Sequence, residues 1–149
     1  MRSTSSPEAG APAPVWETFA HGSDVGVRGR GATAAEAFAN AALAMTAVIA
    51  DPASVRPTRP VHVRCAGTDL DILLLDWLNA LVTRMAIEGM LFRRFDVELK
   101  PGRLEATAWG EAVDRARHAP AVEVKGATLT ELKVTREDGA WLAQCVVDV

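Results

Sequence analysis

Carboxylate side chains occur where the predicted strands and helices of this chain end. Asp24 lies in the turn after the first predicted strand, and Asp51 follows the first predicted helix. Asp148 directly precedes the last residue, Val149. Residues at such ends can meet at one edge of a sheet even when they are far apart in sequence. Because hard divalent ions prefer oxygen ligands, these three side chains and the Val149 carboxylate are a candidate metal site. Ca²⁺ is favoured there, with Mg²⁺ as the alternative, because Ca²⁺ tolerates the irregular geometry of a chain end.

Each of these carboxylates also has an ordinary structural interpretation. Asp24 could stabilise the turn in which it lies, Asp51 could cap the loop before Pro52, and Asp148 could be a solvated residue at the end of the chain. On spacing alone these structural roles are favoured over a metal site.

Two basic side chains lie close in sequence to predicted element ends. His21 ends the first strand, where it either hydrogen-bonds the Asp24 turn, which is the favoured interpretation, or supports a metal site. Lys125 follows Val122 and Val124 in a strand-like segment, and lysine is rare elsewhere in this chain. It is either a solvated strand residue or a contact to a phosphate or to a partner carboxylate.

Hydrophobic patterning predicts the elements that must position these residues. Thr33 and Glu36 form a capping box that begins the first helix, and Gly89 follows the second, whose apolar stripe includes Leu74 and Trp77. The helices are predicted at 33–50 and 69–88, and the strands at 15–21, 25–30, 61–65, 95–99, 104–108, 122–124, 132–134 and 142–147. This order predicts an α+β fold in two layers, with one mostly antiparallel or mixed sheet and both helices on one face.

Length and composition limit the classes of protein to which the chain can belong. Its 149 residues, 49% of them hydrophobic, suit a single domain over residues 15–149 behind a flexible leader over residues 1–14. No apolar run reaches the ~18 residues needed to span a bilayer. A net charge of −3 provides no basic field for unaided binding of nucleic acid. Two cysteines, Cys65 and Cys145, and no signal-peptide pattern indicate reduced thiols in the cytoplasm.

Motifs for nucleophilic or phosphate-loop catalysis are missing from the sequence. It has no Walker A loop, no Gly-x-Gly-x-x-Gly, no Gly-x-Ser-x-Gly and no His-Glu-x-x-His. Catalysis without a metal is therefore disfavoured. A metal-dependent phosphoesterase that uses the three aspartates as its metal cradle stays open, and so does a binding protein with no chemistry of its own.

Several motifs, taken in order from residue 15 to residue 149, resemble those of the archease family. They are His21-Gly22-Ser23-Asp24-Val25-Gly26, the helix from Glu36 to Met45 that ends near Asp51, Asp76-Trp77-Leu78-Asn79, Gly110-Glu111 with His118, Val124-Lys125 and the final Asp148-Val149. Their order and spacing make the resemblance more specific than any one motif is.

The resemblance implies a function that composition could not indicate. It implies a non-enzymatic protein that binds a divalent metal and activates an RtcB-type RNA ligase, promoting GTP-dependent guanylylation and multiple turnover in tRNA splicing or RNA repair. The metal positions of the family would be Asp24, Asp51 and Asp148, with Val149 beside them, and Lys125 would be the family lysine. RNA would be met only through the ligase. The alternatives are a metal-dependent phosphoesterase and a chaperone-like binding module for other nucleic-acid enzymes.

The chain departs from the family pattern shortly after Lys125. Family members commonly have a Tyr-His pair there, whereas this chain has Leu129 and Thr130 and contains no tyrosine. If that pair contacts the ligase in other members, this chain must use other residues.

Overall fold

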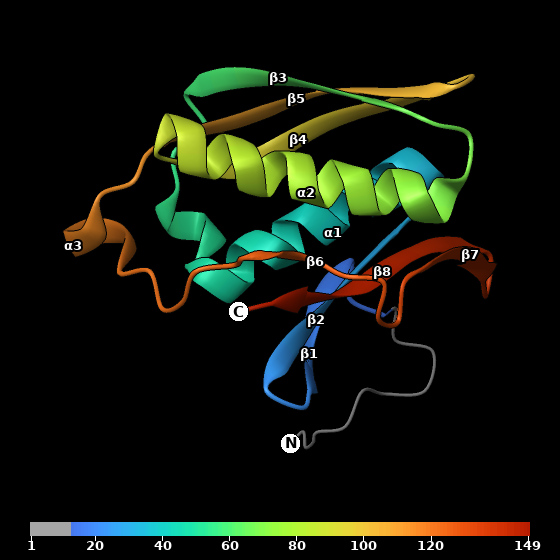
Figure 1. Ribbon diagram of the computed structural model, residues 1–149, viewed down its shortest axis with the longest axis horizontal. Helices are drawn as coiled ribbons and strands as arrows, with labels where there is room; N and C mark the ends of the chain where they lie inside the picture. The colour runs from blue at the N-terminus through green and yellow to red at the C-terminus, as the bar shows by residue number, and fades with distance from the viewer. Residues whose placement is uncertain (1–12) are drawn as a thin grey trace.

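The structure, a computed structural model, describes residues 13–149 and forms two antiparallel sheets with two long helices between them (Figure 1). The elements in chain order are β1 (Trp16–His21), β2 (Asp24–Gly31), α1 (Ala34–Ile49), the 3₁₀ helix η1 (Pro52–Ser54), β3 (Arg59–Ala66), α2 (Leu70–Glu88), β4 (Met90–Lys100), β5 (Arg103–Ala112), α3 (Arg115–His118), β6 (Gly126–Ala127), β7 (Lys133–Glu137) and β8 (Ala140–Asp148). One sheet has the order β1-β2-β8-β6, with β7 also paired to β8, and the other has the order β3-β5-β4.

The α+β class expected from the sequence is confirmed, but the strands divide between two sheets rather than forming one. Helix α1 packs against β1, β2 and β8 of the first sheet and against β4 of the second. Helix α2 likewise lies between β3 and β6. The reason is visible in α1, which buries consecutive residues such as Ala41 and Ala42 or Met45 and Thr46 and therefore has more than one buried face. One sheet can cover only one face of a helix, so the second sheet completes the core.

Both long helices begin and end where the sequence predicts. Thr33 Oγ1 accepts a hydrogen bond from Glu36 N at 3.1 Å, and Glu36 Oε1 accepts one from Ala32 N at 3.1 Å, which completes the capping box. The Asp69 carboxylate caps α2, and Gly89 ends it in the left-handed conformation at φ 63°. These local signals therefore determine the helix boundaries.

The region around residue 93 and the segment after β5 differ from the expected pattern. β4 begins at Met90 rather than at residue 95, because a bulge between Phe92 and Arg94 interrupts the alternation of buried and exposed residues. The expected strand at 122–124 is absent: these residues have no regular structure, and the short strand β6 follows them. The single-turn helix α3 was not expected.

Residues 1–12 lie outside the described part of the chain, so the structure describes only the last two residues of the expected leader at 1–14. Within residues 13–149, no helix is both long enough and apolar enough to cross a membrane.

Helix α2 supplies the largest side chain of the core. Trp77 is fully buried, its ring lies edge-on to Phe95, and its indole Nε1 donates a hydrogen bond to the Phe38 carbonyl at 3.1 Å. Leu74, three residues earlier, is also fully buried. These contacts connect α2 to α1 and to the three-stranded sheet, as the apolar stripe predicts.

Replacing Leu74 with alanine should lower the free energy of unfolding by ~2–5 kcal/mol, through lost burial and the cavity left behind. Urea denaturation measures this loss. Ile72→Ala is the matched control on the same helix, because the Ile72 side chain is 44% exposed and its truncation should cost about 0.5 kcal/mol or less. Equal losses for the two variants would contradict the assigned buried face of α2.

Candidate functional site at the ends of β2 and β8

The pairing of β2 with β8 brings Asp24 next to the end of the chain. In this antiparallel register Val25 lies opposite Val147, so Asp24 at the start of β2 lies opposite Asp148 at the end of β8. The Val149 main-chain N–H donates to Asp24 Oδ1 at 3.4 Å. Three of the four metal-site positions expected from the sequence are thus brought together, although 125 residues separate Asp24 from Val149.

Asp51 has a local role that the sequence also offered as the alternative. Its Oδ1 accepts a hydrogen bond from Ala53 N at 3.0 Å and thereby caps η1. Asp51 nevertheless lies at the same end of the molecule as β8, since Ala121 N donates to Ile49 O and Lys125 N donates to Asp148 O, both at 2.8 Å. The short segment between residues 121 and 125 therefore connects the end of α1 to the end of β8.

The two basic residues lie beside these carboxylates. His21 is paired with Asp24 at the closed end of the β1–β2 hairpin, and its side chain is exposed. Lys125 is exposed as well, and its main-chain bond to Asp148 holds it directly beside the end of β8. The ends of β2 and β8, with Lys125, thus present carboxylates and an ammonium group to solvent.

The donors at these strand ends suit a hard cation only in part. Within residues 13–149, no three His, Cys, Asp or Glu side chains lie close enough together to hold a metal ion. Asp24, Asp148 and the Val149 carboxylate offer oxygen atoms alone, which is the donor chemistry of Ca²⁺ and Mg²⁺. An ion held here would take its remaining ligands from water.

Two polar side chains of α2, whose contacts the sequence did not predict, hold the segment that follows Lys125. Asn79 Oδ1 accepts from Ala127 N at 2.8 Å and its Nδ2 donates to Ala127 O at 3.3 Å, so the amide pairs with the chain as a neighbouring strand would. Asp71 Oδ1 accepts from Val134 N at 2.8 Å. Sequence patterns do not reveal such contacts, because every residue except proline offers the same main-chain N–H to an accepting side chain.

A buried imidazole holds the segment that precedes Lys125. His118 has a fully buried side chain, and its Nδ1 accepts a hydrogen bond from Asp114 N at 2.9 Å. The ring proton is therefore on Nε2, which donates to Glu111 Oε2 at 2.9 Å. Arg117 donates to both carboxylate oxygens of Glu111 at 2.8 Å and to the Ser54 carbonyl at 2.7 Å. This network joins α3 to β5 and η1.

The same network changes the acidity of Glu111. The Arg117 guanidinium, helped by the Arg56 main-chain N–H, lowers the pKa of the Glu111 carboxyl to about 2. Glu111 therefore stays ionised over the physiological pH range, where it holds Arg117 and His118 in place.

Comparison with known proteins identifies the class to which this arrangement belongs. The profile of the Archease protein family matches residues 16–149. The archease of Pyrococcus abyssi is 37% identical over 139 residues, 90% of this chain and 98% of that protein. The archease of Methanopyrus kandleri is 39% identical over 138 residues, 90% of this chain and 99% of that protein.

Solved structures agree with this result. The solution structure of protein 1598 of Methanobacterium thermoautotrophicum superposes with a TM-score of 0.80 at 32% identity, covering 91% of this chain and 99% of that one. An archease of Thermotoga maritima described as a possible chaperone shares the fold, with a TM-score of 0.61 at 15% identity, over 93% of this chain and 97% of its own. The chain is thus a small α+β protein with two sheets around two helices. It belongs to the archease family, which confirms the resemblance found in the sequence.

The stabilising effect of Glu111 should depend on pH. Because folding lowers the pKa of Glu111 from 4.5 to about 2, its contribution is fully present above pH 4.5 and is lost as the pH falls through about 2. The difference in melting temperature between the wild type and Glu111→Gln should therefore be largest near neutral pH and shrink below pH 4.5. Glu123→Gln is the control, because Glu123 has no ion pair within residues 13–149, and its difference should stay small at every pH. A Glu111→Gln difference that grows on acidification would contradict this assignment.

Proposed function

We propose that this chain is a non-enzymatic activator of an RtcB-type RNA ligase that promotes GTP-dependent guanylylation of the ligase and multiple turnover in tRNA splicing or RNA repair. Membership of the archease family supports this proposal. The observation that carries it is the joining of Asp24, Asp148 and Lys125 at one exposed strand end. Cytoplasmic action is part of the proposal, because the free thiols of Cys65 and Cys145 persist where disulfides are rare.

The exposure of these charged groups supports an activator rather than an enzyme. Asp148 is exposed and Asp24 is half-buried, and Lys125 stands at one end of an open groove rather than in a closed cavity that could surround a small substrate. Groups that project from a strand end are instead suited to contact the active site of a partner. A metal-dependent phosphoesterase would need a site that shields its substrate from water, and the ends of β2 and β8 offer no such shelter.

A divalent ion is the second part of the proposal, with Ca²⁺ favoured over Mg²⁺. Asp24, Asp148 and the Val149 carboxylate would hold the ion, with Asp51 and His21 as additional groups at the same end of the molecule. The ion would supply positive charge that offsets the repulsion among the carboxylates. The Val149 main-chain N–H, which donates to Asp24 Oδ1, would help to orient the Asp24 carboxylate toward such an ion.

Lys125 is proposed to contact a phosphate or a carboxylate of the ligase. Its ammonium group makes no ion pair within residues 13–149, so it is available to an anion from outside. The main-chain bond from Lys125 N to Asp148 O supports this proposal, because Lys125 and the proposed metal site could then meet one partner surface.

Calcium should stabilise the protein through the strand-end carboxylates. An ion that binds only the folded state adds ~2.7 kcal/mol at a hundredfold excess over its dissociation constant, so CaCl₂ should raise the melting temperature and EDTA should lower it. Asp24→Asn and Asp148→Asn should each abolish this difference and also cancel stimulation of ligase guanylylation. Asp76→Asn, an exposed carboxylate of α2, should retain both effects. Absence of calorimetric binding at millimolar Ca²⁺ or Mg²⁺, together with full stimulation by both variants, would refute the metal site.

Lys125→Ala should reduce the stimulation of guanylylation severalfold while leaving the melting temperature within about one degree of the wild type, because surface substitutions change stability little. Single-turnover assays of ligase guanylylation measure the first effect. Lys133→Ala is the matched control, since Lys133 is also exposed but lies on β7, where it pairs with Glu137. Normal stimulation by Lys125→Ala with a large loss of thermal stability would show that Lys125 has a structural role instead.

A further inference from the structure

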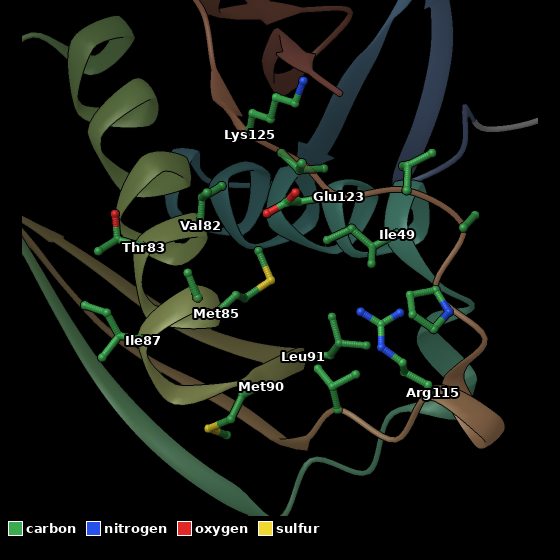
Figure 2. Close-up of a pocket in the computed structure, with 16 residues that line it drawn as sticks. Ile49, Val82, Thr83, Met85, Ile87, Met90, Leu91, Arg115, Glu123 and Lys125 are labelled. Carbon is green, nitrogen blue, oxygen red and sulfur yellow. The ribbon is translucent and has the colours of Figure 1, made fainter.

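An open groove of about 880 Å³ lies between the C-terminal half of α2 and the segment from residue 113 to residue 125. Its floor is apolar: Figure 2 shows Ile49, Met85 and Leu91 pointing toward its centre. Methionine side chains adapt their shape to a bound surface more readily than branched residues do, so Met85 suits a docking floor. The function proposed above uses only Lys125 of this groove.

Exposed apolar side chains of the described residues gather on this groove. Six large hydrophobic residues within 13–149 are exposed, and three of them line it: Ile87 at 71%, Val122 at 41% and Val113 at 39%. Single exposed apolar residues are ordinary, but several around one depression are typical of a surface that a partner covers.

One wall of the groove has main-chain groups without partners. Ala121 N and Lys125 N are bonded to Ile49 O and Asp148 O, but Val122, Glu123 and Val124 between them make no main-chain hydrogen bond within residues 13–149. Unpaired N–H and C=O groups beside an apolar depression are what an incoming extended peptide uses when it adds as a strand.

Charged groups at the rim indicate the chemistry of the occupant. Arg115 and Lys125 line the groove and make no ion pair within the described part of the chain, although the whole protein is acidic, at −3. Figure 2 shows the Arg115 guanidinium directed into the groove and Lys125 at its upper end. Glu123, which also lines the groove, supplies a single negative charge against these two positive ones. A peptide with a carboxylate is therefore favoured over one with a cation.

We propose that this groove binds an extended segment of the RtcB-type ligase, with apolar side chains on its floor and a carboxylate toward Arg115, added as a strand beside residues 122–124. The identity of the partner rests on the function proposed above. Lys125 belongs both to the groove and to the end of β8, so a segment docked here positions the strand-end carboxylates against the same partner.

Binding and stimulation measured separately test this proposal. Ile87→Asp and Val122→Asp should each weaken binding of the ligase about tenfold or more in titration calorimetry, because a carboxylate in an apolar contact loses its hydration. Ile72→Asp, on the exposed face of the first turn of α2, should bind within about twofold of the wild type. Thermal melts confirm that the three variants are folded. In the wild type, amide exchange at residues 122–124 should slow when the ligase is added.

The outcomes distinguish the docking proposal from the function. Stimulation of guanylylation by the groove variants should return at saturating concentration, whereas Asp148→Asn should bind normally without stimulating. If both groove variants bind as tightly as the wild type, the docking proposal fails and the activator function stands. If they bind weakly but the wild type never stimulates the ligase, the docking proposal stands and the activator function fails. If the wild type does not bind the ligase, both fail, and a dimer that Ile87→Asp dissociates would assign the groove to a second copy of this chain.

Discussion

The antiparallel pairing between β2 and β8 is the contact on which the candidate site depends. It joins the second strand of the chain to the last, from Val25 opposite Val147 to Gly31 opposite Trp141. The other edge of β8 is hydrogen-bonded to β6 and β7, so β8 pairs with three different strands. Asp24 meets Val149, and Lys125 meets Asp148, only because β8 lies in the interior of its sheet. The two strands of this pairing are far apart in sequence, and contacts of this kind slow folding.

Small residues allow α1 to cover this pairing. A Cβ atom at Gly29 of β2 would collide with the main chain of Ala37 and Ala41, so helix and strand approach more closely than any side chain would permit. Both alanines are fully buried. Helix α1 packs on both β2 and β8. This close contact therefore holds the two strands, and the carboxylates at their ends, in fixed positions relative to each other.

The sequence predicts a structural feature well when the residues that determine it are close together in the chain. The helix boundaries were predicted correctly because a cap such as Thr33 or a terminator such as Gly89 acts within one turn. The division into two sheets was not, because alternation shows which face of a strand is buried but not which strand lies beside it. Of the site, the strand-end positions of Asp24 and Asp148 were foreseen from the order of elements. The contacts of Asn79 and His118 were not foreseen. Asn79 binds the main chain of Ala127, and His118 binds Glu111, and only the fold determines that these groups lie beside them.

In the proposed function, the groove supplies affinity for the partner and the charged strand end supplies its activation. Charged groups at an exposed strand end bury little apolar area, and exposed ion pairs are worth only ~0–1 kcal/mol, so they cannot by themselves hold a partner. The groove can hold one, because a partner that covers the exposed Ile87, Val113 and Val122 removes their nonpolar surface from water. Lys125, shared by both regions, couples that binding to the position of Asp148.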